Sequence, residues 1–246
     1  MKTINSRQNP EIKAIYALRR PQGRREQKRF AVEGFRACSA MLEAGWEPVG
    51  LYIMQENIEK SQKVASEASI TLVSGPVMEK ISQTKTPSGI VGIFPLPDAP
   101  EAEKLESGVV LANISDPGNM GTLIRTCAAM GFKSMVVIEG ADPWGHKVVQ
   151  STAGAIAQVD IFEWSWKQLL ENKKDKKLCA LVARDGKKPE AIEKNCLLIV
   201  GNEAHGIAPE WIEQCDQKIT LPMSDKTESL NAAVAGSIAL YLMASK

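Results

Sequence analysis

The chain has 246 residues and an almost neutral charge balance, because 30 Lys and Arg face 29 Asp and Glu for a formal net charge of +1. Its 44% hydrophobic and 24% charged residues are typical of a globular protein with one large or two modest domains. Overall charge therefore gives no argument for nucleic-acid binding. We also expect no secretory signal and no membrane helix, which places the protein in the cytoplasm.

The first 100 residues are expected to form a small α/β domain, because helical and strand patterns alternate along them. The expected elements are a short helix within 1–20, a helix at 35–45, a strand at 49–54, a polar helix at 55–68, and strands at 71–73 and 89–94. The proline-rich stretch 95–100 is the clearest linker, so the domains predicted are 1–100 and 101–246.

The second domain is expected to alternate strands and helices from Gly108 onward. Its first expected strand starts at Gly108 and contains the apolar run 109–111, and the later strands are expected at 135–138, 159–162, 179–183, 197–200 and 218–221. Its expected helices follow the turn after the first strand and cover 147–154, 167–171 and 229–244. The last helix is so apolar that we expect it to lie in the core or to form a homodimer interface.

Positive charge gathers at the N-terminus, where residues 1–36 hold ten Lys and Arg against three Glu. Within this segment Arg19, Arg20, Arg24 and Arg25 flank a Pro/Gly turn. A local net charge of +7 is typical of a phosphate-binding surface, so we expect these arginines to bind RNA. A solvated helical face is the alternative.

Polar residues, glycines and prolines follow three expected strands. After the apolar run 109–111 comes an Asp-Pro-Gly-Asn turn, with Asn119 near the start of a helix and Arg125 further along it in apolar surroundings. After 197–200 comes a loop that carries Glu203 between two glycines. In open α/β sheets ligands bind at the carboxyl ends of strands, so this loop and turn are candidate site elements.

The third segment runs from the strand ending near Pro222 to Ser229 and Asn231 at the start of the last helix. Each segment alone has an ordinary structural explanation, such as a turn or a helix cap. Three such segments at three strand ends favour a functional site.

Together the three segments resemble the motifs of the SpoU (TrmH-like) RNA 2′-O-ribose methyltransferases of the SPOUT superfamily. The matching residues are Asn119, Gly121 and Arg125, then Gly201, Glu203 and Gly206, then Pro222, Ser229, Leu230 and Asn231. Residues 148–155 also resemble a segment of that family. Residues 9–13, 30–34 and 86–91 are similar to the substrate-binding domain of one of its branches.

This resemblance implies a parallel-sheet SPOUT domain with a deep trefoil knot, preceded by a small α/β RNA-binding domain. It further implies S-adenosylmethionine bound around Gly201, Leu221 and Leu230, structured rRNA or tRNA as partner, and a homodimer with the active site near the subunit boundary. In that chemistry a ribose 2′-hydroxyl attacks the sulfonium methyl group in line, which requires precise orientation and an activated hydroxyl.

The family assigns the activating role to the residue that matches Arg125. Because a guanidinium stays protonated, we expect Arg125 to stabilise the forming alkoxide and to grip the adjacent phosphate. Glu203 is expected to orient Arg125 or to relay the proton, while Asn119, Ser229 and Asn231 fix the geometry.

Two other functions remain open at this point. One is a non-catalytic RNA-binding or ribosome-assembly factor with a methyltransferase fold, which is disfavoured because every matched catalytic position is filled. The other is a small-molecule methyltransferase, which the N-terminal basic cluster disfavours. Five scattered cysteines without a Cys-x-x-Cys pair, and only two histidines, argue against a metal site and for free thiols in a reducing compartment.

Overall fold

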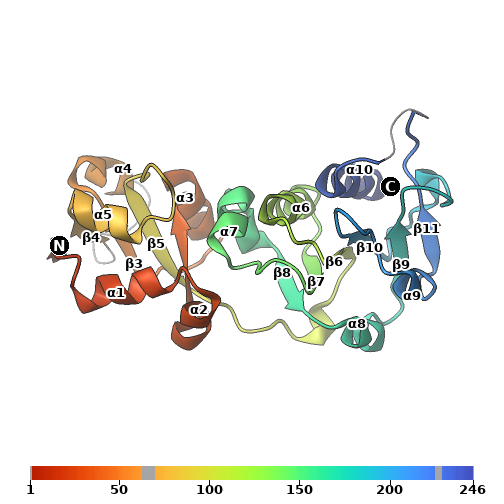
Figure 1. Ribbon diagram of the computed structural model, residues 1–246, viewed down its shortest axis with the longest axis horizontal. Helices are drawn as coiled ribbons and strands as arrows, with labels where there is room; N and C mark the ends of the chain where they lie inside the picture. The colour runs from red at the N-terminus through yellow and green to blue at the C-terminus, as the bar shows by residue number, and fades with distance from the viewer. Residues whose placement is uncertain (1, 63–69, 225–228, 246) are drawn as a thin grey trace. The chain divides into compact units, whose positions relative to one another are not determined.

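The computed structural model describes residues 2–62, 70–224 and 229–245. These residues form two compact units, one made of Met1–Asp98 with Trp144–Ala157 and the other of Ala99–Pro143 with Gln158–Lys246. The elements of both can be followed in Figure 1. Within the described ranges, no helix is long and apolar enough to span a bilayer.

The first unit is built on a mixed five-stranded sheet with the order β1-β4-β3-β5-β2, in which β5 runs antiparallel to both of its neighbours. Its strands are β1 (Lys2–Ile4), β2 (Arg29–Glu33), β3 (Gly50–Ile53), β4 (Ile70–Val73) and β5 (Ile90–Pro95). Its helices are α1 (Pro10–Ala17), α2 (Pro21–Gln27), α3 (Phe35–Glu43), α4 (Ile58–Gln62), α5 (Gly75–Ile81) and α7 (His146–Thr152).

The N-terminal 20 residues differ from the single helix expected there, because the structure has strand β1 and helix α1 within them and begins a second helix, α2, at Pro21. Proline explains the division, since Pro10 and Pro21 each stand at the first turn of a new helix. Strand β2 and helix α5 were not expected from the sequence. The polar helix expected at 55–68 is a 3-10 turn at Gln55–Asn57 and α4, and the rest of it, 63–69, lies outside the described residues.

Helix α7 belongs to the first unit, although the sequence places residues 147–154 in the second domain. The ring of Trp144 lies 5.0 Å from that of Phe30 on β2, and the Trp46 indole donates a 3.2 Å hydrogen bond to the carbonyl of Ala157. At Gly154 a Cβ would lie 2.5 Å from the Ala40 side chain of α3, so only glycine permits this close approach. Aromatic packing from distant segments thus decides where α7 lies.

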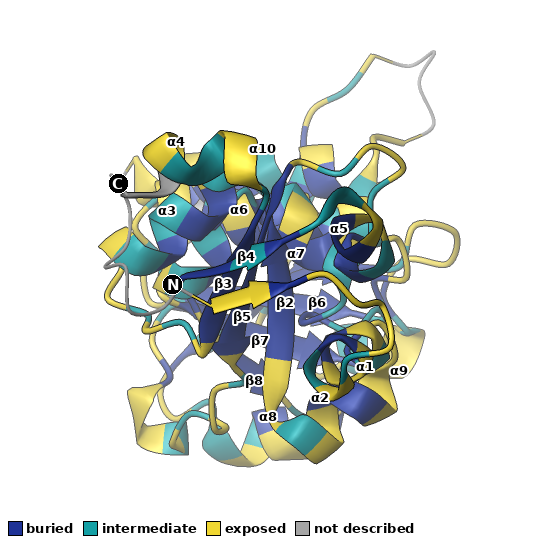
Figure 2. Ribbon diagram, turned by 90° about the vertical axis from the view of Figure 1, so that its left-hand side faces the viewer, coloured by how far each residue is buried: buried dark blue, intermediate teal, exposed yellow. Residues whose placement is uncertain are grey.

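The second unit contains a fully parallel six-stranded sheet with the order β11-β9-β10-β6-β7-β8. Its strands are β6 (Gly108–Ala112), β7 (Ser134–Ile138), β8 (Asp160–Glu163), β9 (Lys177–Leu181), β10 (Cys196–Gly201) and β11 (Gln217–Ile219). Its helices are α6 (Pro117–Ala129), α8 (Trp166–Asn172), α9 (Pro209–Ile212) and α10 (Ala232–Ala244). Figure 2 shows the central strands buried, as their continuous apolar runs require.

The order of this sheet reverses between β6 and β10. From β6 the chain moves outward through β7 to β8, then returns on the other side so that β10 lies between β9 and β6. Gly201 at the end of β10 pairs with Ala112 at the end of β6. The loops that leave these two strands therefore meet at a topological switch point, the usual ligand position in open α/β sheets.

Two element boundaries matter for the site. Helix α10 begins at Ala232 rather than at residue 229, so Ser229 and Leu230 precede it and Asn231 is its N-cap. Strand β11 ends at Ile219, before the expected residue 221. Helix α9, which was not expected, follows the loop after β10.

Candidate active site

Helix α6 begins directly after the turn that follows β6. Asp116 is its N-cap, and the Asp116 carboxylate accepts a 2.8 Å hydrogen bond from the backbone N–H of Asn119. Pro117 stands at the first helical position, where its fixed φ favours helix initiation. These local interactions place the Asn119 side chain in the first turn of α6, above the end of β6.

The loop after β10 is a tight turn closed by Asn202 and Gly206, whose backbone groups exchange two 2.9 Å hydrogen bonds. Gly206 has a φ of +70°, and a Cβ on Gly201 would lie 2.3 Å from the Gly206 carbonyl carbon. Gly201 therefore has no room for a side chain, whereas Gly206 has the room but adopts a left-handed backbone conformation that favours glycine. The Asn202 side-chain oxygen accepts from the backbone N–H groups of Ala204 and His205, which fixes the turn internally.

Asn202 also ties this turn to the one after β6. Its side-chain nitrogen donates to the Asn113 carbonyl oxygen at 2.9 Å, and at 3.4 Å to both the Ser115 hydroxyl and the Glu203 carboxylate. Residues from two loops almost 90 positions apart in sequence are thus held in register by one amide.

A chain of amides joins the three motif segments. The Asn231 oxygen accepts from the backbone N–H groups of Ala233 and Val234, as a helix N-cap does, at 2.9 and 3.2 Å. Its nitrogen donates to the Asn119 side-chain oxygen at 3.0 Å. The Asn119 nitrogen in turn donates to Glu203 at 2.9 Å.

The chain has a fixed direction. Because the cap bonds occupy the Asn231 side-chain oxygen, Asn231 has only its side-chain nitrogen to offer Asn119. Asn119 must therefore accept with its own side-chain oxygen. The Asn119 nitrogen then points at Glu203, where it needs an acceptor. The start of α10 therefore sets the orientation of every amide up to the carboxylate.

Glu203 accepts hydrogen bonds from five donors. Besides Asn119 and Asn202, these are the Ser115 hydroxyl at 3.1 Å and the backbone N–H groups of Ser115 and Asp116 at 3.4 and 3.2 Å. Desolvation raises the pKa of this carboxyl, but the hydrogen bonds, led by the one from Asn119, outweigh it and hold the pKa below its usual value of 4.5. Glu203 is therefore ionised at neutral pH.

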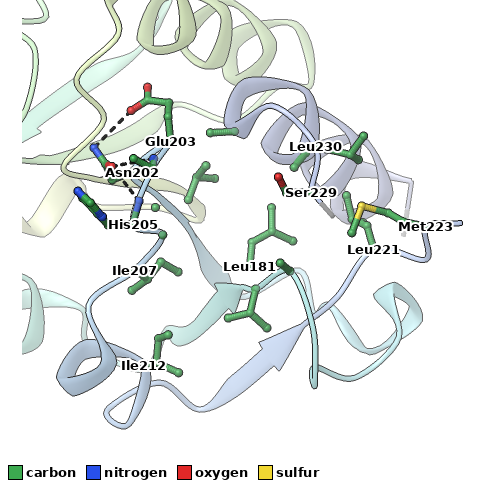
Figure 3. Close-up of a pocket in the computed structure, with 18 residues that line it drawn as sticks. Leu181, Asn202, Glu203, His205, Ile207, Ile212, Leu221, Met223, Ser229 and Leu230 are labelled. Atoms are coloured by element: carbon green, nitrogen blue, oxygen red, sulfur yellow. Dashed lines mark hydrogen bonds between the residues drawn. The ribbon is translucent and has the colours of Figure 1, made fainter. Parts of the chain in front are cut away.

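A cavity of about 410 Å³ lies beside this network. Its walls combine apolar side chains with the polar turn after β10, as Figure 3 shows. Among the lining residues are Gly201, Glu203, Leu221, Ser229 and Leu230, five of the eight predicted catalytic and cofactor-binding residues. Leu181, His205, Ile207, Ile212 and Met223 also line it.

Arg125 stands apart from the network. It is exposed on α6, six residues beyond Asn119 and so about 9 Å further along the helix. Within the described ranges, its side chain makes no hydrogen bond or ion pair, and Glu203 is held by Ser115, Asn119 and Asn202 instead. The expectation that Glu203 orients Arg125 is thus not met within this chain.

The four candidate RNA-binding arginines differ in the first unit. Arg20 and Arg25 are exposed, whereas Arg24 is only 4% exposed and donates a 2.8 Å hydrogen bond to the Leu18 carbonyl. Arg19 is exposed but bonds the carbonyl oxygens of Lys80 and Ser82. Arg24 therefore stabilises the connection between α1 and α2 and is withdrawn from the predicted RNA contact.

Asn202 and Ser115 are site residues that were not predicted from the sequence. A signal was present for both, since Asn202 stands between Gly201 and Glu203 and Ser115 immediately precedes the helix-capping Asp116. Asn and Ser are common in turns, so their presence in these loops suggested no functional role. Only the pairing of β6 with β10 brings the two residues together.

Comparison with known proteins finds relatives over almost the whole chain. Residues 106–241 match the model of the SpoU rRNA Methylase family, and residues 9–92 match the MRM3-like substrate binding domain. The chain is 26% identical over 249 residues to the 23S rRNA (guanosine(2553)-2′-O)-methyltransferase RlmP of Bacillus subtilis, covering 98% of each protein. It is also 26% identical to the uncharacterized tRNA/rRNA methyltransferase slr1673 of Synechocystis, covering 97% of this chain and 92% of that protein.

Solved structures share the fold over almost the whole chain. The crystal structure of an AdoMet-bound rRNA methyltransferase from Sinorhizobium meliloti superposes with a TM-score of 0.86 at 26% identity. The match covers 98% of this chain and 97% of that one.

Proposed function

Because the chain belongs to the SpoU rRNA Methylase family, as the sequence motifs indicated, we propose that it transfers the methyl group of S-adenosylmethionine to a ribose 2′-hydroxyl of RNA. Ribosomal RNA is the substrate class we favour over tRNA, since RlmP and the S. meliloti protein are named for it. The observation that carries the proposal is the directed chain from Asn231 through Asn119 to Glu203, which joins all three motifs beside a cavity.

The cavity suits S-adenosylmethionine in size and chemistry. Its volume lies in the range of small-molecule sites, and its apolar walls and few polar groups match an adenosine with a charged tail. We assign Gly201, Leu221 and Leu230 to holding the cofactor. At Gly201 a Cβ would collide with the backbone of Gly206, so the turn packs as closely as glycine allows. The bound cofactor supplies an electrophilic methyl group on its sulfonium.

The residues of the chain then have to orient the ribose and stabilise its alkoxide. Asn119 and Glu203 present hydrogen-bonding groups whose orientation is set in advance by the cap of α10, which is the arrangement that favours reaction over simple binding. A lowered pKa makes Glu203 a weak base. We therefore assign it the role of holding Asn119 and the Ser115 turn, and we assign Ser229, on the cavity wall, to positioning.

Arg125 is proposed as the electrostatic stabiliser. Its guanidinium is a cation with several N–H donors, and its position on an exposed face of α6 leaves it available to RNA. Two N–H donors of the Arg125 guanidinium suit the phosphate next to the reacting ribose. Held there, the positive charge of Arg125 would stabilise the developing negative charge of the alkoxide.

A homodimer is proposed from the surface of α10. Its buried face includes Gly236, where a Cβ would lie 2.6 Å from the Leu123 side chain of α6. Its other face exposes Val234, Ile238 and Tyr241 at helical spacing, with exposed fractions of 47%, 40% and 60%. Contiguous apolar residues of this kind mark interaction surfaces. Light scattering at micromolar concentration should report a dimer, and a monomer would refute this part of the proposal.

Residues 1–100 are proposed as the RNA-binding domain and 101–246 as the methyltransferase domain. None of the five cysteines forms a disulfide in the described part of the chain, which suits a reducing cytoplasm. Exposed Arg20 and Arg25 support an RNA role for the first domain. The deep trefoil knot implied by the SPOUT resemblance is proposed for the second, and its parallel sheet with β10 between β9 and β6 is compatible with it. A catalytically silent RNA-binding factor is not favoured, because the amide chain and Arg125 are all present.

Two measurements test the function. Calorimetric titration with S-adenosylmethionine in the presence of a chelator should show binding. Absence of binding under these conditions would contradict metal-independent cofactor binding. Mapping of 2′-O-methyl groups in total RNA from cells with and without the gene should reveal a position that loses its methyl group. Cofactor binding without any lost position would support the silent-factor alternative.

A further inference from the structure

Tyr16 on helix α1 has an unusual setting. It is 46% exposed, and it is the single aromatic among the exposed large hydrophobic residues in the described part of the first unit. The guanidinium carbon of Arg19 lies 4.5 Å from the centre of its ring, and the ammonium of Lys80 lies 5.6 Å from it. An exposed ring with two cations over it is not needed to build the core.

Backbone carbonyl oxygens hold the two cations. Arg19 donates to the carbonyl oxygens of Lys80 and Ser82, and the Lys80 ammonium donates to the Arg7 carbonyl at 2.6 Å. A carbonyl orients a cation without neutralising it. Neighbouring carboxylates have other partners, because Glu79 pairs with the Arg7 guanidinium at 2.7 Å.

Glu11, on the same helix as Tyr16, also has partners other than Arg19 and Lys80. Its carboxylate pairs with Lys2 and accepts a 2.6 Å hydrogen bond from the Tyr52 hydroxyl. The surface around Tyr16 is therefore positive, within a segment whose sequence carries a net charge of +7.

The turn that holds Arg19 is anchored by hydrogen bonds to a buried carboxylate. The Ser82 hydroxyl donates to Glu33 at 2.7 Å, and the same carboxylate, 3% exposed, accepts from the Thr84 hydroxyl at 2.7 Å and from the Gln83 backbone at 2.9 Å. The carbonyl that holds Arg19 thus belongs to a turn anchored in the core. Preorganised groups lose less entropy when a ligand binds.

We propose that Tyr16, with Arg19 and Lys80, is a stacking platform for an unpaired base of the RNA substrate. The proposal rests on the proposed function and adds to it the form of RNA that the first unit reads. Aromatic faces and guanidinium planes bind unstacked bases of loops and single strands, while the cations attract the flanking phosphates. A continuous duplex offers no free base face, so the substrate should carry a loop, bulge or single-stranded segment.

The test uses the full-length protein, a fluorescein-labelled oligoadenylate and a blunt RNA duplex of equal length. Tyr16→Leu should weaken binding of the oligoadenylate by about tenfold, as expected for loss of one base–aromatic stack, and leave duplex binding unchanged. Tyr16→Phe, which keeps the ring, should bind both probes like the wild type. Arg25→Gln is the charge control, and it should weaken both probes and lower the salt slope by about one unit.

The outcomes separate this proposal from the proposed function. Unchanged oligoadenylate binding by Tyr16→Leu, or an equal loss on both probes, overturns the platform. Tyr16→Leu should unfold at the same temperature as the wild type. If its unfolding temperature is lowered, the selective loss reflects a damaged fold, and the platform is overturned in that case too. Methylation of ribosomal RNA is measured on the same preparations. If methylation is absent while the selective loss is present, the function is wrong and the platform stands.

Discussion

Asn231→Asp tests the directed amide chain at its origin. The change is isosteric, and aspartate is as good a helix N-cap as asparagine, so the bonds from Ala233 and Val234 should persist. The second carboxylate oxygen, however, replaces the nitrogen that donates to Asn119. Asn119 then lies between two carboxylates and can donate to only one of them.

If Asn119 turns its nitrogen toward the new carboxylate, its hydrogen bond to Glu203 is lost, and the cost follows from that bond. A hydrogen bond to a charged group contributes about 1.5–3 kcal/mol. Glu203 is exposed, so solvent screening reduces the value to about 1–1.5 kcal/mol. If the bond orients the reacting groups, kcat/KM for RNA methylation should fall about five- to tenfold, because about 1.4 kcal/mol corresponds to a factor of ten. The new charge should also raise the pKa of Glu203 and shift the acid limb of the pH–rate profile upward.

Asn231→Ala is the matched control. It removes the cap and should lower the free energy of unfolding by about 1 kcal/mol, but it places no charge beside Asn119. Asn231→Asp should therefore be the more stable and the less active of the two variants. Methyl-transfer kinetics, pH profiles and thermal unfolding of both variants decide the matter. Wild-type kcat/KM and an unshifted pH profile in Asn231→Asp would refute the directed chain.

Three further predictions concern the cofactor, the RNA and the first unit. Arg125→Ala should abolish methyl transfer with little change in calorimetric S-adenosylmethionine affinity, since Arg125 acts on the transition state, and near wild-type rates would contradict its role. Gly201→Ala should weaken cofactor binding by tenfold or more, because the Cβ would displace the Gly206 backbone, whereas unchanged affinity would place the cofactor elsewhere. Desolvation raises the pKa of Glu33, but hydrogen bonds led by the one from Ser82 outweigh desolvation and lower the pKa below its usual value of 4.5. The ionised Glu33 carboxylate therefore stabilises the fold above about pH 4.5, and this stabilisation is lost as the pH falls further. Glu33→Gln should accordingly cost about 2 kcal/mol in urea unfolding at neutral pH and less at low pH, and a pH-independent cost would contradict this reasoning.

Much of the second unit follows from local sequence. The apolar run at 108–112, bounded by a glycine and a polar turn, is a strand in any tertiary setting that buries both faces. Asp116 and Pro117 start α6, and Asn231 caps α10, by bonds to residues two or three positions away. These signals are short in range, so they can be found without the fold.

Other local signals were too weak for prediction. Strand β1 has three residues, and β2 is buried along most of its length, so neither shows the alternation that marks a half-exposed strand. The burial of Arg24 was equally hidden, because its partner is a backbone carbonyl and any residue type could supply it.

The site itself was decided by tertiary structure. The sequence by itself determined which residue types stand at three strand ends, and so the family and the candidate residues. Only the reversal of strand order places β10 beside β6, which brings Glu203 within 2.9 Å of Asn119 across 84 positions of sequence and leaves Arg125 outside the network. Contacts at that separation depend on the pairing of whole strands, and no local pattern of residues encodes which strands will be neighbours.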